Sequence, residues 1–154
     1  MHENPAHAII ITGGSSGIGL SVACLLAKEG VSVSILARDQ ARLAGARDQI
    51  SSVAADEAGV EAISCDVRSM PACQAAVERA ISVHGVPNWA ISCAGIVKPG
   101  TFSSLSLEDH LAQLNSNFIG SLNFASAVIP VMKNRGSTRL VFVASGAALV
   151  GIYG

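Results

Sequence analysis

The stretch of sequence that decides the fold is Thr12-Gly13-Gly14-Ser15-Ser16-Gly17-Ile18-Gly19. It follows a short apolar run, Ala8–Thr12, that is typical of a buried strand, and it leads into Leu20–Glu29, where apolar residues recur at helical spacing. A glycine-rich turn between a strand and a helix predicts an anion site, because the first N–H groups of a helix lack partners and carry a partial positive charge. No Gly-Lys-Ser/Thr follows the turn, so a Walker-type loop is excluded.

The glycines of this turn have separate expected roles in holding a diphosphate. Gly13 permits the tight turn, Gly17 lets the backbone approach the phosphates without a Cβ in the way, and Gly19 lets the helix pack closely on the strand. The two serines add hydroxyl donors. The residues expected to hold a dinucleotide cofactor at this turn are Thr12, Gly13, Ser15, Ser16, Gly17, Ile18 and Gly19.

Strand-like and helix-like segments alternate along the rest of the chain. Further strands are expected at Val31–Ala37, Val60–Cys65, Trp89–Cys93 and Leu140–Ala144. Helices are expected from Asp39 to about Ala55, from Ser69 to Gly85 with Pro71 in the first turn, and from Ser106 to about Lys133, with Asp109 completing a capping box and Pro130 bending or ending the helix. This alternation predicts one α/β domain over residues 1–154, a Rossmann-type doubly wound parallel sheet in three α/β/α layers, with ligands beyond the carboxyl ends of its strands.

The end of the second expected strand, Ala37-Arg38, indicates which dinucleotide is bound. A site that prefers NAD usually carries a carboxylate here to accept the ribose hydroxyls, and Ala37 offers no such acceptor. Arg38 offers a planar guanidinium for a 2′-phosphate, which favours NADP(H). The alternative is a solvated surface arginine that pairs with Asp39.

Composition excludes several classes of partner. Half of the 154 residues are hydrophobic and the net charge is −1, so the chain has no global field that would attract nucleic acid or an anionic membrane. The four cysteines form no C-x-x-C pair, which favours reduced structural thiols over disulfides or zinc, and no metal site is expected. Neither a leader peptide nor an apolar run of about 18 residues is visible, so a cytoplasmic protein is expected.

The order of these motifs resembles the short-chain dehydrogenase/reductase superfamily. The resemblance is carried by the glycine turn, by Asp66 after the third strand, Ala94-Gly95 after the fourth, Asn117 in the long helix and Ser145 after the fifth strand, and it covers nearly the whole chain. Within that superfamily the chain is most similar to the 3-ketosphinganine reductases. The segments that carry this narrower match are 12–19, 37–38, 93–95, 141–143 and 151–154.

The resemblance implies cofactor roles for two further segments. Asp66 matches the carboxylate that accepts a hydrogen bond from the adenine amino group, and Val67 is expected to contribute its backbone to the same contact. The alternative is that Asp66 only caps the following turn. Ser92-Cys93-Ala94-Gly95 matches the family's Asn-Asn-Ala-Gly, so Cys93, Ala94 and Gly95 are expected to line the cofactor ribose. Ser92 departs from the pattern, which puts the sheet-bracing contacts of the asparagine in doubt.

Two catalytic roles follow from the same resemblance. Asn117 matches the helix asparagine whose local backbone distortion holds a water in a proton relay, the alternative being a helix-surface amide. Ser145 matches the serine that orients the substrate carbonyl, the alternative being a turn-forming serine before Gly146. The family's proton donor, a tyrosine in Tyr-x-x-x-Lys, is not matched, because the single tyrosine, Tyr153, lies too close to Ser145. We therefore expect a natural protein longer than this sequence, and no turnover by these 154 residues alone.

The implied activity is NADPH-dependent reduction of a lipid-like ketone, specifically the 3-keto group of 3-ketosphinganine, in eukaryotes at the cytosolic face of the endoplasmic reticulum. Another reductase of the superfamily, acting on 3-oxoacyl thioesters, steroids or small ketones, is the first alternative. A non-catalytic NADP sensor is the second, and Ser145 and Asn117 argue against it. In the relatives the long helix joins a four-helix interface, so a homo-oligomer is expected.

Overall fold

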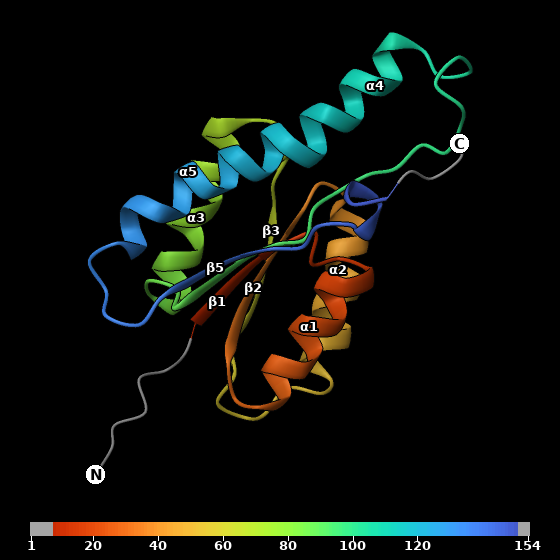
Figure 1. Cartoon of the computed structure of the whole chain (residues 1–154). Coiled ribbons are helices and arrows are strands. Elements are labelled where there is room, and N and C mark those ends of the chain that lie inside the picture. The colour runs from red at the N-terminus through yellow and green to blue at the C-terminus, as the bar shows by residue number, and fades with distance from the viewer. Residues whose placement is uncertain (1–7, 151–154) are drawn as a thin grey trace.

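The computed structural model describes residues 8–150, which form a five-stranded sheet of parallel strands in the order β3-β2-β1-β4-β5 (Figure 1). The strands are β1 (Ala8–Thr12), β2 (Ser32–Ala37), β3 (Val60–Ser64), β4 (Trp89–Ser92) and β5 (Arg139–Phe142). The chain first adds strands on one side of β1 and then returns to its other side. The strand order therefore reverses between β1 and β4, and a ligand crevice is expected there.

Helices follow each of the first four strands, as the alternation predicted. They are α1 (Gly17–Lys28), α2 (Gln40–Ser51), α3 (Met70–His84), α4 (Leu107–Leu114) and α5 (Gly120–Met132), with a π-helical turn η1 (Asn115–Ile119) between the last two and a 3-10 turn η2 (Gly146–Ala148) after β5. The predicted caps are confirmed, because the side chains of Asp39, Ser69 and Ser106 accept from backbone N–H groups in the first turns of α2, α3 and α4.

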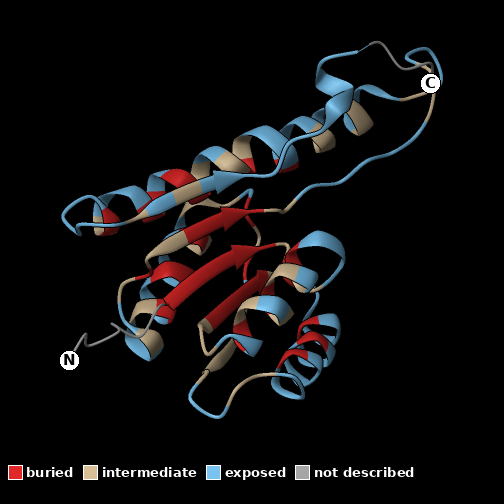
Figure 2. Ribbon diagram, turned by 60° about the horizontal axis from the view of Figure 1, so that its bottom comes forward, coloured by how far each residue is buried: buried red, intermediate tan, exposed pale blue. Residues whose placement is uncertain are grey.

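The sheet is covered on both faces, which confirms the predicted three-layer α/β/α arrangement. Ile9 and Ile11 of β1 point into a core shared with α1 and α2, whereas Ile10 points into the opposite core, which Phe124 of α5 and Ala76 of α3 complete. This alternation follows from the two-residue period of a strand. The central strands are almost wholly buried, whereas β5 lies at an edge and is largely exposed (Figure 2).

The long helix expected from Ser106 to about Lys133 differs from the prediction in one respect. It runs over this range, but η1 interrupts its α-helical winding at Asn115–Ile119. Pro130 lies inside α5, and the helix ends only two residues later, at Met132. A proline removes one backbone hydrogen bond, and so close to the C-terminus of the helix little regular winding remains to be lost.

β5 pairs only with β4 among the described strands, and its solvent side carries apolar residues. Val141, Phe142 and Val143 are 39%, 51% and 42% exposed. Arg139 lies opposite Trp89 in the strand register, with its guanidinium carbon 5.4 Å from the ring centroid, so a cation–π contact covers part of this edge. Across residues 8–150, no helix has the length and apolar character to span a membrane.

Candidate dinucleotide-binding site

A cleft opens at the carboxyl ends of the strands, where the strand order reverses. We call it the switch-point cleft. Its walls come from the glycine turn, from the end of β2 with the start of α2, from the ends of β3 and β4, and from η1. The residues that line it are Gly13, Ser15, Ser16, Leu36, Ala37, Arg38, Asp39, Arg42, Cys65, Asp66, Val67, Ala94, Gly95, Ile96 and Ser116.

The switch-point cleft brings together most of the residues predicted for a cofactor. Those that line it as predicted are Gly13, Ser15, Ser16, Arg38, Asp66, Val67, Ala94 and Gly95. Those that do not are Thr12, Gly17, Ile18, Gly19 and Cys93, together with Asn117 and Ser145. The first group forms the walls, and several members of the second group hold those walls in place.

Gly13 fixes the glycine turn against the end of β4. Its φ is +69°, and a Cβ there would lie 2.8 Å from the Ala94 backbone nitrogen. A Cβ on Gly19 would lie 2.5 Å from the Gly13 carbonyl oxygen, so the start of α1 approaches the turn itself rather than the strand. The turn is thus closed by contacts that only glycine permits.

Thr12 is completely buried at the end of β1 and supports a wall of the cleft without lining it. Its Oγ1 accepts hydrogen bonds from the backbone N–H groups of Cys93 and Ala94, each at 3.2 Å. These bonds join the end of β1 to the segment that follows β4. Thr12 therefore positions the Ala94 wall, and its side chain does not face the cleft.

The N-terminus of α1 leaves room for an anion. Ser16 is its N-cap residue in an extended conformation, and its side chain makes no capping hydrogen bond. Gly17 follows with φ at +54°, and a Cβ there would meet no atom within 4 Å. The first N–H groups of an α-helix have no intrahelical acceptor, so this end can bind a phosphate through the backbone.

Two arginines stand at the end of β2. Arg38 makes no hydrogen bond or ion pair within residues 8–150, so the alternative of an Arg38–Asp39 pair is not what the structure shows. Asp39 instead accepts from the Arg42 backbone N–H at 3.0 Å, and its other oxygen lies 3.6 Å from Arg42 Nε. The guanidinium of Arg38 is free for a ligand, with Arg42 beside it on the same wall.

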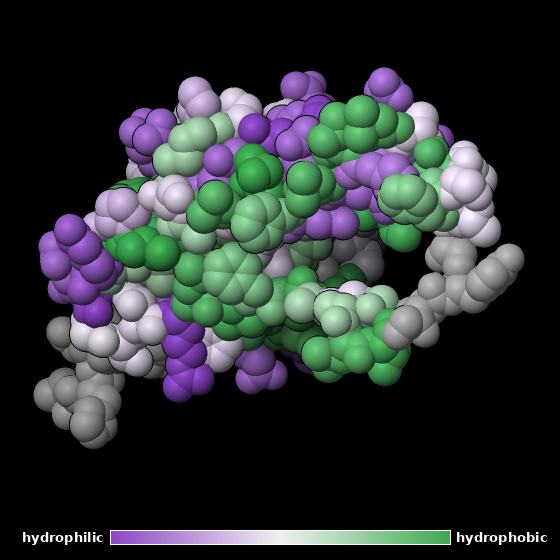
Figure 3. Space-filling model, turned by 45° about the horizontal axis from the view of Figure 1, so that its top comes forward, coloured by the Kyte–Doolittle hydropathy of each residue, from purple (hydrophilic) through white to green (hydrophobic). Residues whose placement is uncertain are grey.

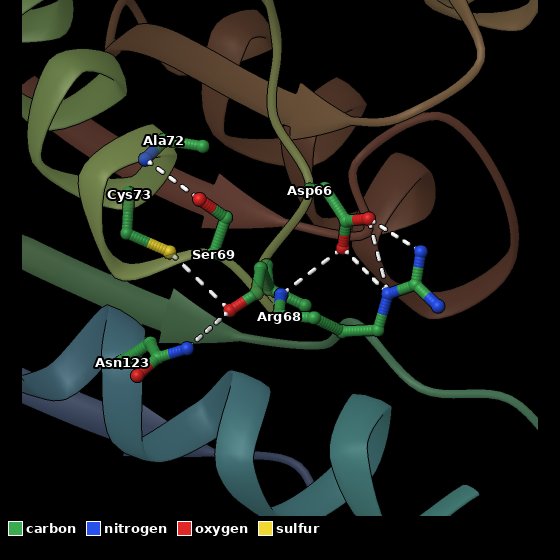
Figure 4. Close-up of polar contacts among 7 residues, drawn as sticks. Asp66, Arg68, Ser69, Ala72, Cys73 and Asn123 are labelled. Carbon is green, nitrogen blue, oxygen red and sulfur yellow. Dashed lines mark hydrogen bonds and ion pairs between the residues drawn. The ribbon is translucent and has the colours of Figure 1, made fainter. Parts of the chain in front are cut away.

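Asp66 holds an ion pair at the opposite wall (Figure 4). Arg68 donates from Nε and Nη2 to the Asp66 carboxylate at 2.6–3.0 Å, and its backbone N–H donates at 3.0 Å. These hydrogen bonds lower the pKa of Asp66, and the charge of Arg38 adds to the effect. Asp66 therefore caps the turn, as the alternative interpretation expected, and it also lines the cleft as an anion; its role toward adenine stays a prediction.

The backbone beside Asp66 is anchored to the helices behind it. The Val67 carbonyl accepts from Asn123 Nδ2 at 2.9 Å and from Cys73 Sγ at 3.6 Å (Figure 4). A Cβ on Gly120 would lie 2.6 Å from Val67 Cγ2, so α5 approaches this segment as closely as glycine allows. The wall formed by Asp66 and Val67 is thus held from α3 and α5 together.

All four cysteines are free thiols, and Cys65 and Cys73 lie behind this wall. A hydrogen bond with Cys73, together with burial, raises the pKa of Cys65, which keeps its thiol protonated at neutral pH. Burial also raises the pKa of Cys93. No cluster of three or more metal-ligating side chains occurs in the described part of the chain.

Asn117 clamps the segment after β4. Its Oδ1 accepts from the Ile96 N–H at 2.8 Å, and its Nδ2 donates to the Ile96 carbonyl at 2.9 Å. One and two turns earlier, Gln113 accepts from the Lys98 N–H at 3.1 Å and Asp109 binds Lys98 Nζ at 2.7 Å. Asn117 is therefore not merely a surface amide, and it lies in η1, where the helix backbone is distorted.

Ser92 contacts the start of α5 through its hydroxyl. Its Oγ lies 3.1 Å from Ser121 Oγ, and Ser121 donates to the backbone carbonyl of Asn117 at 2.8 Å. Since a serine hydroxyl can donate and accept, this arrangement links β4 to η1.

Ser145 lies outside the switch-point cleft. Its Oγ accepts from the Ala147 N–H at 3.1 Å and caps η2, which is the turn-forming role. The hydroxyl proton remains available as a donor, so this cap does not exclude a contact with a substrate oxygen. Tyr153 lies outside the described residues.

Seven residues that line the cleft were not among the predicted site residues, namely Leu36, Ala37, Asp39, Arg42, Cys65, Ile96 and Ser116. Two of them, Arg42 and Ser116, carry polar side chains with no role in the sequence analysis. Arg42 was hidden inside the helix expected from Asp39, although a basic residue one turn after a predicted phosphate ligand is a detectable signal. Nothing in the sequence around Ser116 marked it as a site residue. Its burial depends on packing against residues that are distant in the sequence.

Comparisons with known proteins agree with this geometry. The profile of the short chain dehydrogenase family matches residues 7–154. A 3-dehydrosphinganine reductase of Danio rerio is 32% identical over 98% of this chain and 46% of its own length, and the ketoacyl reductase HetN of a Nostoc strain is 33% identical over 94% and 49%. The chain thus spans about half the length of these curated relatives.

Solved structures share the fold over nearly the whole chain. A variant of the actinorhodin polyketide ketoreductase, solved with NADPH, matches with a TM-score of 0.89 and 29% identity over 99% of this chain and 58% of that one. An NADPH-bound short chain oxidoreductase from Pseudomonas aeruginosa matches with a TM-score of 0.87 and 29% identity over 93% and 55%. This chain therefore belongs to the short chain dehydrogenase family.

Proposed function

We propose that this chain binds NADP(H) in the switch-point cleft and forms the cofactor-binding part of a ketone reductase. The observation that carries the proposal is the unpaired guanidinium of Arg38 on the wall of a cleft that a glycine turn and a helix N-terminus complete. An arginine without a partner at this position suits a 2′-phosphate, and the residue before it offers no carboxylate to the ribose.

The residues of the cleft fit such a dinucleotide on structural grounds. The space beside Gly17 admits a diphosphate close to the backbone, because no atom beyond its chain neighbours and its own helix backbone lies within 4 Å of the place where a Cβ would stand. Arg38 and Arg42 would hold the 2′-phosphate, Asp66 would accept from the adenine amino group, and Ala94 and Gly95 would lie along a ribose. When bound, the reduced nicotinamide supplies a hydride to a carbonyl carbon.

The chain's own contributions to that chemistry are positioning and hydrogen bonding. Asn117 holds the segment after β4 through its side chain, while its backbone carbonyl, in the π-helical turn, can accept from a water as well as from Ser121. Ser145 would orient the substrate by donating a hydrogen bond from its hydroxyl to the carbonyl oxygen, without transferring the proton. Both roles are proposals that rest on the family's pattern.

For the substrate we favour a lipid-like ketone, with 3-ketosphinganine as the first candidate. Proteins named 3-dehydrosphinganine or 3-ketodihydrosphingosine reductase stand at 32% identity in three vertebrates. A second candidate, a 3-oxoacyl thioester, is favoured by the ketoacyl reductase HetN at 33% identity. A hydroxysteroid reductase and a non-catalytic NADP sensor remain the further alternatives.

The proposal is tested in two steps. First, titration of the purified chain with NADPH and NADH, followed by the fluorescence of the nicotinamide, should give binding with preference for NADPH. Absence of saturable binding by either cofactor would refute the proposed site. Second, turnover of 3-ketosphinganine and of a 3-oxoacyl thioester with NADPH should be measured for the product of the complete gene, and absence of both activities would favour a sensor.

We also propose that the chain assembles as a homo-oligomer through one face of the long helix. An apolar stripe of exposed side chains follows this helix: Leu107, Leu111, Leu114, Phe118, Leu122 and Ile129. These residues recur at spacings of three, four or seven, so they lie on one face. Apolar side chains also gather on the molecular face that α5 and β5 share (Figure 3). A second copy that packs its own stripe against this one would bury both.

A further inference from the structure

The hydroxyl of Ser116 is buried in the wall of the switch-point cleft without a partner. Ser116 is 5% exposed, and its Oγ makes no hydrogen bond to the described residues. Leaving a buried hydroxyl unpaired costs about 1–3 kcal/mol, and native folds rarely keep such a group without a reason. The two other unpartnered buried atoms among residues 8–150, His84 Nε2 and His110 Nε2, do not belong to residues that line this cleft.

The position of Ser116 is fixed from two sides. On one side the next residue, Asn117, bonds both backbone groups of Ile96, at 2.8 and 2.9 Å. On the other side Gly120 touches Val67, whose carbonyl Asn123 holds at 2.9 Å. The turn η1 is therefore held between the segments that follow β3 and β4, and Ser116 cannot easily turn its hydroxyl away to find another partner.

We propose that Ser116 Oγ forms a hydrogen bond with the adenosine half of the bound dinucleotide. This inference rests on the proposed function. Ser116 lines the cleft together with Cys65, Asp66 and Val67, the wall at which the adenine amino group would be accepted. A serine hydroxyl donates one hydrogen bond and accepts others, so it suits a ribose hydroxyl or a ring nitrogen of adenine.

The proposal has a thermodynamic signature that a purely structural serine would not show. In the ligand-free chain the unpaired hydroxyl is already desolvated, so Ser116→Ala removes an unfavourable group and leaves the melting temperature unchanged or raised. In the complex the same substitution removes a hydrogen bond. A neutral hydrogen bond of this kind corresponds to a loss of affinity of roughly threefold to tenfold.

The experiment compares Ser116→Ala with the unsubstituted chain by isothermal titration calorimetry and thermal unfolding. The ligands are NADP+ and adenosine 2′,5′-bisphosphate, which contains the adenosine half and lacks the nicotinamide. We expect Ser116→Ala to lose about threefold to tenfold in affinity for both ligands. The control is Ser82→Ala, which removes a partnered hydroxyl on α3 outside the cleft and should leave both affinities unchanged.

Each other outcome has a defined meaning. Equal affinity of Ser116→Ala and the unsubstituted chain for both ligands would overturn the proposal, as would a loss for NADP+ alone, which would place the contact at the nicotinamide half. A marked fall in the melting temperature of the ligand-free variant would show that the hydroxyl has an internal partner, and this too would overturn it. Failure of the unsubstituted chain to bind either ligand would instead refute the proposed function.

Discussion

Reversing the charge at Arg38 should change which dinucleotide the chain prefers. Arg38 makes no ion pair within the described residues, so Arg38→Asp breaks no contact of the fold and acts on the ligand alone. A hydrogen bond to a charged group contributes about 1.5–3 kcal/mol, or roughly 12-fold to 160-fold in affinity. Because Arg38 is exposed, solvent screening reduces this toward the lower end, while the introduced carboxylate adds repulsion toward a 2′-phosphate.

The assay is a fluorescence titration of the unsubstituted chain and Arg38→Asp with NADPH and NADH, each at low and high salt. We expect affinity for NADPH to fall at least tenfold, affinity for NADH to change little or rise, and the difference to shrink at high salt. The matched control is Arg47→Asp, the same charge reversal at an exposed position of α2 that does not line the cleft. Equal losses for both cofactors, or an equal effect of Arg47→Asp, would refute the selector role.

Three further predictions concern stability and assembly. Gly13→Ala should lower the free energy of unfolding, measured by urea denaturation, by about 1–3 kcal/mol. The reason is that Gly13 has a positive φ and that a Cβ there would lie 2.8 Å from the Ala94 backbone. The control Gly136→Ala should lower it far less, because a Cβ there would lie in open space. Burial lowers the pKa of His84 below 6.5. Between that lowered value and 6.5 the unfolded chain binds a proton that the native chain rejects, so stability should fall as the pH drops below about 6.5, and His84→Gln should reduce this slope. Phe118→Lys, which places a charge in the apolar stripe, should reduce the mass measured by light scattering after size exclusion.

Other results would contradict these predictions. Equal urea midpoints for the alanine variants at the two glycines would mean that the turn relaxes without cost. A stability profile between pH 5 and 8 that His84→Gln leaves unchanged would show that other groups dominate acid unfolding. If the unsubstituted chain is already monomeric at the concentrations used, the apolar stripe does not bring two copies of this chain together.

Local features of the fold could be predicted because their signals are local. The end of α3 at Gly85 and the capping box of Ser106 and Asp109 follow from residue types at fixed offsets, and both are confirmed. The parallel sheet follows from the alternation of strand and helix periods. Arg38 was predicted from the residue types at the end of the second strand and Asp66 from the family's pattern, and the structure brings both to one cleft.

Features that depend on distant packing could not be predicted. Ser116 is buried where Asn117 of η1 bonds Ile96 and Gly120 at the start of α5 approaches Val67, and these partners lie 20 and 49 residues before Ser116 in the sequence. The ion pair of Asp66 with Arg68 joins near neighbours, but it depends on rotamers that no sequence pattern specifies. No sequence pattern specifies the contact between the hydroxyls of Ser92 and Ser121 either, because Ser92 lies on β4 and Ser121 on α5.

Because of the π-helical turn η1, the long helix from α4 to α5 holds two loops, the segments that follow β3 and β4. Asp109, Gln113 and Asn117 recur every four residues and hold the segment after β4, whereas Gly120 and Asn123 hold the segment after β3. Each residue of an α-helix advances about 100° around the axis, so deleting Phe118 would restore regular winding and swing one half of the helix away from its loop. The turn therefore sets the angle around the helix axis between the side chains that hold the segment after β4 and those that hold the segment after β3. Deletion of one residue in η1 should disrupt the cleft more than deletion of a residue at either end of the helix.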